Sequence, residues 1–351
     1  MKRLLIRISL TGLLLLATPT LAPAQTPQNA LCDENGCIAA IAAVDFHGRE
    51  AWRLTDGKTV AVVVPSLARV MSFKRAGGQE WLWSAPDHAE KVPDWNGWMN
   101  WGGDKTWLSP ADKWGAMGGK DRWPPLLEWE KDFQYEVQTG GKLKIWGSAS
   151  PITGLRVSRV LYFDDNGDFV IEQTASREAK SQIAGSLRAG LWSVTQINSV
   201  GLDGVFVPRA AQSVYESGFR PMITKGSAPT ETVLPGLLKV TPTEAGAYKI
   251  GTDAPRSAIA AVRGDLALVQ KTKYLQGEYP DGDTPQSGTT VQLYMTGNPR
   301  LTYQELELLS PLLTFYPGTR WTHTVRWSLH QLPSSNINDA AVHAEIDRLL
   351  G

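Results

Sequence analysis

Cysteine and histidine are scarce in this chain, and neither sign of charge is in excess. Its 351 residues include two cysteines, five histidines, and 35 basic residues against 35 acidic ones. A balanced charge offers no electrostatic attraction for nucleic acid or an anionic membrane, so neither is an expected partner. The sequence also lacks a Gly-x-Ser-x-Gly elbow, a phosphate-binding glycine loop and a His-Glu-x-x-His pair, which argues against the hydrolases, nucleotide-binding enzymes and zinc proteases that carry these motifs.

Long hydrophobic runs are missing beyond the first 24 residues, so no membrane span is predicted. Residues 1–24 have the pattern of a secretory signal peptide, because three basic residues precede an apolar run over 8–16 and a small-residue cleavage site ends at Ala24. We therefore predict export to the periplasm, or secretion, after cleavage behind Ala24.

Both cysteines lie in the predicted N-terminal leader, residues 25–44. An oxidising compartment favours a disulfide between Cys32 and Cys37, which are separated by four residues. A metal site is the alternative, but it needs further ligands, and the histidines are scattered. We expect no metal and no cofactor.

Short β-branched and aromatic runs separated by turn residues continue from Ala51 to Leu329. The clearest hairpin joins the runs 160–163 and 169–172 through Asn166-Gly167, and Asp56-Gly57 has the composition of a second hairpin turn. No repeat and no low-complexity linker divides the chain. The sequence predicts an all-β fold, a large antiparallel β-sandwich over residues 45–330.

The tail, residues 331–351, is the one segment with a helical pattern. Asn338 is a candidate N-cap for a short helix in which four apolar residues share a face: Val342, Ile346, Leu349 and Leu350. We expect this helix to clamp against the sheet.

Tryptophan is concentrated in one stretch, because ten of the 14 tryptophans lie between Trp81 and Trp146. They alternate with Gly, Pro, Asp and Lys in neither a helical nor a strand period, which indicates loop structure. Indole rings can stack on a sugar while neighbouring polar groups bind its hydroxyls. The candidate polar ligands are Asn100, Asp104, Lys105 and Lys113. A plainer alternative is that the tryptophans close one end of the β-structure.

The block Asn100-Trp101-Gly102-Gly103-Asp104-Lys105-Thr106-Trp107, followed by Lys113-Trp114-Gly115, resembles an uncharacterised bacterial family related to the galactose mutarotase-like proteins. Two later blocks, at 278–282 and 303–311, keep the order and spacing of that group's closing strands. The resemblance covers residues 45–330. It implies a β-supersandwich whose concave sheet face binds a carbohydrate, and mutarotases of that fold use a His as general acid and a Glu as general base.

The sequence departs from that catalytic pattern. The stretch comparable to the segment with the mutarotase His, residues 190–197, contains no histidine, and Glu278 alone precedes the Pro280-Asp281 pair where the mutarotase Glu would be. Classical mutarotase catalysis is therefore not expected from the resemblance.

Carboxylates remain as candidates for acid and base. Glu305 and Glu307 are two apart in a predicted strand and so project from one face, where each can raise the pKa of the other. The alternative is that they are solvated or paired with Arg326 or Lys273. Asp281 caps a turn or lies at the rim of a cleft, and Asp104 with Glu305 or Asp281 is a reserve glycosidase pair.

Two main hypotheses follow from these candidates. The first is a carbohydrate-binding protein with stacking platforms and polar ligands, namely Trp101, Trp107, Trp114, Trp192, Asn100, Asp104, Lys105, Lys113 and Gln196. The second is an epimerase-like enzyme acting at the anomeric carbon of a sugar through Glu305, Glu307, Glu278 or Asp281. A structural or partner-binding sandwich is a third possibility. The first hypothesis requires Asp104 and Lys105 to lie beside one open trough. No motif indicates which sugar is bound or the oligomeric state.

Overall fold

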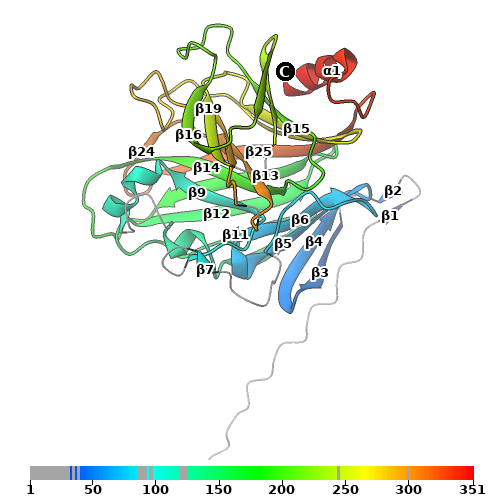
Figure 1. Cartoon of the computed structure of the whole chain (residues 1–351). Coiled ribbons are helices and arrows are strands. Elements are labelled where there is room, and N and C mark those ends of the chain that lie inside the picture. Colours follow the sequence, from blue (N-terminus) through cyan, green and yellow to red (C-terminus); the bar gives the residue numbers. More distant parts are fainter. Residues whose placement is uncertain are drawn as a thin grey trace, which may run out of the picture.

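The computed structural model describes residues 32–33, 36–37, 40–85, 93–94, 98–118, 125–242, 246–298 and 300–351. This part of the chain folds into two large antiparallel sheets with one α-helix at the C-terminus (Figure 1). The predicted signal peptide lies outside the described residues. In the N-terminal ribbon of β1 (Cys32–Asp33) and β2 (Gly36–Cys37), the backbone register places Cys32 opposite Cys37. Their disulfide stays a prediction.

The first sheet has eleven strands and contains the N-terminal strands of the sandwich, whereas the last strand lies in the second sheet. Its strands, in spatial order, are β16 (Arg220–Gly226), β19 (Gly246–Thr252), β22 (Val291–Met295), β23 (Tyr303–Leu309), β14 (Leu187–Asn198), β9 (Asp104–Ser109), β6 (Arg69–Arg75), β5 (Thr59–Val64), β4 (Arg49–Thr55) and β3 (Ala40–Phe46), with β24 (Leu313–Phe315) also paired to β14. Because β3 already begins at Ala40, the sheet starts inside the predicted leader of residues 25–44, before the expected boundary at residue 45.

The second sheet has ten strands, and its spatial order differs from its sequence order. The strands are β10 (Gln134–Gln138), β11 (Lys142–Trp146), β12 (Leu155–Phe163), β13 (Phe169–Arg177), β25 (Arg320–Gln331), β21 (Leu266–Thr272), β20 (Ala258–Arg263), β15 (Gly204–Pro208), β18 (Leu237–Thr241) and β17 (Thr230–Leu234). A small ribbon of β7 (Pro93–Asp94) and β8 (Trp98–Met99) accompanies the two sheets.

The β12–β13 hairpin shows how local sequence sets the structure. Residues of β12 alternate between buried and half-buried along its whole length, as a strand with one face on a core must. The turn is held by Asp164 Oδ1, which accepts hydrogen bonds from the backbone N–H groups of Asn166 and Asp168, both at 3.0 Å. Gly167 supplies the positive φ of 79° that the turn requires. The hairpin predicted at Asn166-Gly167 is confirmed.

A continuous apolar core fills the space between the two sheets and includes residues from both. The helix α1 (Ala340–Leu350) packs on the opposite face of the ten-stranded sheet, and all four apolar residues of the predicted helix face are buried. The predicted cap is wrong by one residue: Asp339 Oδ1 accepts from Ala341 N at 3.0 Å, while Asn338 Oδ1 accepts from Lys239 Nζ. Among the described residues, no helix has the length and apolar character needed to cross a membrane.

Candidate functional site

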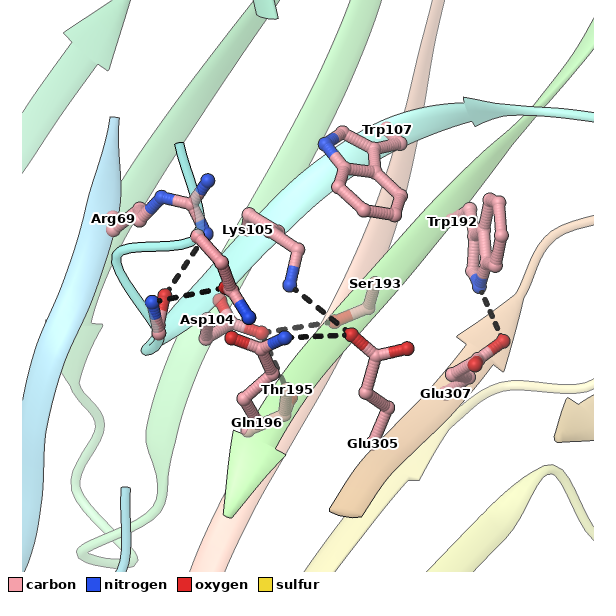
Figure 2. A network of polar contacts seen from close by, with 12 residues as sticks. Arg69, Asp104, Lys105, Trp107, Trp192, Ser193, Thr195, Gln196, Glu305 and Glu307 are labelled. Carbon is pink, nitrogen blue, oxygen red and sulfur yellow. Dashed lines mark hydrogen bonds and ion pairs between the residues drawn. The ribbon is translucent and has the colours of Figure 1, made fainter. Parts of the chain in front are cut away.

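The centre of the tryptophan-rich stretch is a strand, β9, and not a loop. All six of its residues are buried. Because both faces of the strand are buried, polar and apolar residues do not alternate along it, and the sequence shows no strand period. Successive side chains point to opposite faces, and the predicted pair Asp104 and Lys105 is therefore divided (Figure 2). The expectation that both side chains lie beside one trough is wrong.

Asp104 faces the ten-stranded sheet. Its carboxylate accepts hydrogen bonds from the Arg159 guanidinium, from the Thr195 hydroxyl at 2.8 Å and from the Ser193 hydroxyl at 3.4 Å. Asp104 and Arg159 are both fully buried. This pair connects the two sheets through the core. Asp104 therefore lies between the sheets, and its predicted place in a sugar site is wrong.

Lys105 points to the other side of the eleven-stranded sheet, away from the ten-stranded sheet. We call this side the site face and define it by eight residues: Lys105, Trp107, Trp192, Gln196, Lys249, Gln292, Glu305 and Glu307. Lys105 Nζ reaches across β14 to Glu305 Oε1 at 3.5 Å, and Gln196 Nε2 donates to the same oxygen at 2.9 Å (Figure 2). Burial lowers the pKa of Lys105, and the nearby Glu305 carboxylate opposes that shift.

A second charged pair mirrors the first across β23. Lys249, on β19, reaches over β22 to Glu307, and its Nζ lies 2.9 and 3.1 Å from the two carboxylate oxygens. The Trp192 indole N–H donates to Glu307 Oε2 at 2.9 Å. Burial raises the pKa of Glu307 to about 7, and neighbouring Glu305 adds to the rise while Lys249 opposes it. Glu305 and Glu307 thus share one face, as predicted from their spacing.

The cations of these pairs were not found by sequence reasoning. The predicted partners of the glutamates, Arg326 and Lys273, are not in contact with them, because Arg326 lies in the other sheet and pairs with Asp164. Lys249 was missed. Lys249 lies in β19 between Tyr248 and Ile250, which are buried in the core, so the strand period predicts that its side chain faces outward. That pattern does not distinguish a site residue from any other outward-facing lysine.

Two glutamine side chains complete the polar part of the site face. Gln196 and Gln292 use their Nε2 groups as donors, Gln196 to Glu305 and Gln292 to Asp281 Oδ2 at 2.7 Å. Their carbonyl oxygens are buried and have no hydrogen-bond partner in the described part of the chain. Unsatisfied buried acceptors are uncommon in folded proteins and mark places where a donor is missing.

Asp281 joins this region, whereas Glu278 does not. Asp281 adopts a positive φ of 62°, and its hydrogen-bond partner Gln292 lies directly opposite Glu307 in the β22–β23 register. Glu278 instead pairs with Arg188 at 2.8 Å, and both side chains are partly exposed. Of the four candidate carboxylates, three are therefore brought to one area.

The four predicted stacking tryptophans are largely buried, from Trp114 at 0% exposed to Trp101 and Trp192 at 8%. Trp107 packs edge-on against Trp114 and Trp192, with ring centroids 5.7 and 5.5 Å apart. Trp107, Trp114 and Trp192 all belong to the main apolar core, with Trp114 fully buried, and Trp101 belongs to a separate cluster near β3 to β5. The role of Trp114 as a stacking platform is thus contradicted, and the plainer interpretation of core packing holds for it.

Lysine side chains cover the two remaining indoles of the site face. Lys105 Nζ is 4.7 Å from the ring centroid of Trp107, and Lys249 Nζ is 4.9 Å from that of Trp192. Such cation–π contacts hold the ammonium groups in place. The Trp107 indole has a further partner, because Trp107 and Arg69 both donate to Glu130. Arg69 also donates to Gly102 O at 2.9 Å.

Asn100 and Lys113 lie outside the network. Asn100 is buried and its Oδ1 accepts from Gly102 N at 3.3 Å, as expected for a residue that shapes a turn. Lys113 is 61% exposed and pairs with neighbouring Asp112 at 3.2 Å. The structure therefore does not bring these two predicted sugar ligands together with Lys105. In the described part of the chain, no three His, Cys, Asp or Glu side chains are arranged to hold a metal ion.

Comparison with known proteins identifies the fold but no sequence family. No family model matches the sequence, and no curated protein matches it. Among solved structures, the chain is similar to the Slr1438 protein of Synechocystis sp. PCC 6803, with a TM-score of 0.53 and 12% identity over 84% of this chain and 99% of that one. A putative aldose 1-epimerase from Klebsiella pneumoniae gives a TM-score of 0.51 and 11% identity over 89% of this chain and 88% of that one.

A TPR-domain containing protein from Parabacteroides distasonis is also similar, with a TM-score of 0.52, 14% identity and 86% of this chain covered. The chain spans about half of that protein's length, 51%. At these identities the likeness shows the fold alone, which is the galactose mutarotase-like sandwich expected from the sequence.

Proposed function

We propose that the protein binds a carbohydrate on the site face. The observation that carries this proposal is that two charged pairs lie next to each other on one face of the eleven-stranded sheet. Lys105 pairs with Glu305 from one side of β23, and Lys249 pairs with Glu307 from the other. Glu305 is 12% exposed and Lys249 13% exposed, so solvent reaches one member of each pair. A fold shared with aldose epimerase-like proteins supports the choice of ligand.

The chemistry of this face suits a polyol. A sugar hydroxyl both donates and accepts a hydrogen bond, so it is matched by a carboxylate next to an ammonium group. The carbonyl oxygens of Gln196 and Gln292, which have no partner among the described residues, are acceptors that hydroxyl donors would satisfy. We place Glu305 and Lys249 in direct contact with the sugar, and Lys105 and Glu307 behind them as the groups that hold them in place.

Acid–base catalysis at the anomeric carbon is the second candidate, and the raised pKa of Glu307, about 7, favours it. In this reaction Glu305 takes the proton of the anomeric hydroxyl, while Lys249 gives a proton to the ring oxygen as the bond between that oxygen and the anomeric carbon breaks. Glu307, whose carboxyl is protonated at the start, gives its proton to Lys249 and recovers it when the ring closes. Rotation about the C1–C2 bond and reversal of these steps gives the other anomer.

Calorimetric titration of the full protein with a panel of neutral and acidic monosaccharides tests binding. We expect saturable binding of at least one sugar, weakened at least tenfold in Glu305→Gln and in Lys249→Met. Glu345→Gln, which alters an exposed pair with Arg348 on α1, is the matched control and should bind normally. If no sugar binds, or if both site-face variants bind as the wild type does, the proposal is wrong.

Anomeric exchange separates the two candidates. Two-dimensional exchange NMR on the sugar that binds measures its interconversion with and without protein. Catalysed exchange that is lost in Glu305→Gln supports the enzyme, whereas tight binding without faster exchange leaves a binding protein.

We also propose that the chain is exported, by cleavage behind Ala24, and that Cys32 and Cys37 form a disulfide after export. The sequence pattern of residues 1–24 supports the first part, and the backbone register supports the second. Intact mass of the protein purified from the periplasm and medium, before and after alkylation under non-reducing conditions, tests both. A mass that retains residues 1–24, or two alkylated thiols, contradicts the respective part.

A further inference from the structure

The ten-stranded sheet leaves one of its central strands uncovered at one end. Strand β21 ends at Thr272, whose partner on β25 is Val325, while β25 runs on to Arg320. In the described chain, residues 320–324 of β25 therefore pair with β13 alone. A cavity of about 580 Å³ lies at this place, and its lining includes Lys271, Lys273 and Arg326. We call it the β25 groove.

The charged side chains that line the β25 groove have one sign. Its lining contains these three cations and no carboxylate. Arg326 is paired with Asp164 and lies 3.9 Å from Asp168, but among the described residues neither Lys271 nor Lys273 forms an ion pair. Burial lowers the pKa of Lys271, and the nearby Asp168 carboxylate opposes that shift without pairing with the ammonium group. An anion in the groove would relieve the cost of that burial.

Neutral donors surround the same cavity. Trp321 and His323 both line the groove, and each has a buried ring nitrogen, Nε1 and Nε2, that lacks a partner in the described part of the chain. Burial lowers the pKa of His323 to about 4, so its ring is neutral near pH 7. His323 Nδ1 lies 3.4 Å from the Thr272 hydroxyl. In the tautomer in which Nδ1 accepts from that hydroxyl, Nε2 carries a proton and is a donor.

We propose that the β25 groove binds an oxyanion, the sulfate or phosphate group of a small ligand, between Lys271, Lys273 and Arg326. Two ammonium groups that form no ion pair with the described residues, together with one guanidinium, suit a tetrahedral group of charge near −2 better than a single carboxylate. The cavity volume leaves room for the remainder of a small molecule. This site lies in the ten-stranded sheet, so it is separate from the site face and does not depend on the proposed carbohydrate function.

Titration of the full protein with sodium sulfate and with sodium phosphate tests the proposal, with ionic strength held constant by sodium chloride. Backbone amide NMR shifts of residues 271–273 and 321–324 report on the groove. We expect saturable shifts confined to these segments, and at least tenfold weaker binding in the double variant Lys271→Met/Lys273→Met. The matched control, Lys180→Met/Lys225→Met, removes the same charge from two exposed positions and should bind as the wild type does.

Three outcomes would overturn the proposal: no saturable shift with either anion, the same shifts with chloride, or an equal loss of affinity in the control pair. The site-face variant Glu305→Gln should retain anion binding. If the protein binds no sugar on the site face, the test of anion binding in the β25 groove is unaffected. If the groove binds no anion, the test of sugar binding is likewise unaffected.

Discussion

Two charge networks lie on opposite faces of the eleven-stranded sheet, and neighbouring residues of β9 enter different ones. Between the sheets, the Asp104 carboxylate is surrounded by the Arg159 guanidinium and two hydroxyls, and all of these groups are buried. On the site face, Lys105 takes part in a network that solvent reaches at Glu305 and Lys249. Burial of a charged residue therefore does not by itself indicate a ligand site.

The two networks differ in which of their groups lack a hydrogen-bond partner. The carboxylate of Asp104 accepts from three donors, and the group left without a partner in the described chain is a buried donor, Arg159 Nε. On the site face, two amide carbonyl oxygens have no partner in the described chain, and one glutamate has a pKa shifted to about 7. The unsatisfied donor between the sheets is fully buried, whereas the unsatisfied acceptors of the site face belong to a network that is partly exposed at Glu305 and Lys249, where a ligand can complete it.

The largest expected effect is at the inter-sheet pair. Arg159→Met removes the cation from a fully buried carboxylate, and breaking a buried pair in this way costs about 3–5 kcal/mol of unfolding free energy. Urea denaturation followed by circular dichroism measures it. The double variant Arg159→Met/Asp104→Leu, which removes both charges, should regain much of the loss. A single variant as stable as the wild type would mean that this network is not structural.

A smaller effect on stability is expected at Lys105. Lys105→Met removes a desolvated cation and leaves Glu305 with its Gln196 hydrogen bond and partial contact with water, so we expect a loss of about 1–2 kcal/mol. Sugar binding should fall at least tenfold, because Glu305 loses its ion-pair partner and is held by Gln196 alone. Urea denaturation and calorimetry on the same sample check both values. If Lys105→Met lost as much stability as Arg159→Met, the two networks would contribute equally to the free energy of unfolding, and the proposed difference between them would be wrong.

The pH dependence of stability should also distinguish the two faces. The folded-state pKa of Glu307 is raised to about 7 from the ordinary value of 4.5, so the folded protein holds a proton that the unfolded chain has released. The contribution of Glu307 to stability is therefore greatest below pH 4.5 and falls as the pH rises to 7, by a few kcal/mol at most.

Denaturation of the wild type and Glu307→Gln across pH 4 to 8 measures this slope. The variant lacks the titrating group, so the difference in stability between the two proteins should change over that window and become constant above it. A constant difference throughout would show that Glu307 titrates normally.

The smallest effect is expected at Lys113, which the sequence placed in the same candidate set as Lys105. Its pair with Asp112 is exposed, and such pairs contribute about 0–1 kcal/mol. Lys113→Met should change neither the urea midpoint nor the sugar affinity measurably. A clear loss of sugar binding would extend the site beyond the site face.

Features set by local sequence were predictable. The Asn166-Gly167 hairpin and the apolar side of α1 depend on residues close in the chain, and the structure confirms both. The shared face of Glu305 and Glu307 follows from the period of a strand. The cap at Asp339 was missed because Asn338 has a tertiary partner, Lys239, that no local pattern reveals.

The partners of the glutamates could not be predicted, for the same reason. Lys105 and Lys249 reach Glu305 and Glu307 across intervening strands, and those neighbours are set by the order of strands in the sheet, which a single sequence does not encode in any local pattern. The opposite orientation of Asp104 and Lys105 would have been predictable if β9 had been recognised as a strand. Its burial on both faces removed the alternation that identifies one.

The position of β25 also determines when the protein can fold. This strand follows all the other described strands in the sequence but sits between β13 and β21, so a growing polypeptide cannot complete the ten-stranded sheet until Arg320–Gln331 has been synthesised. Until then both neighbours present open edges to which other strands can add. A nascent or truncated form that stops before Arg320 is accordingly the species most prone to aggregate, and the one for which a chaperone would matter most.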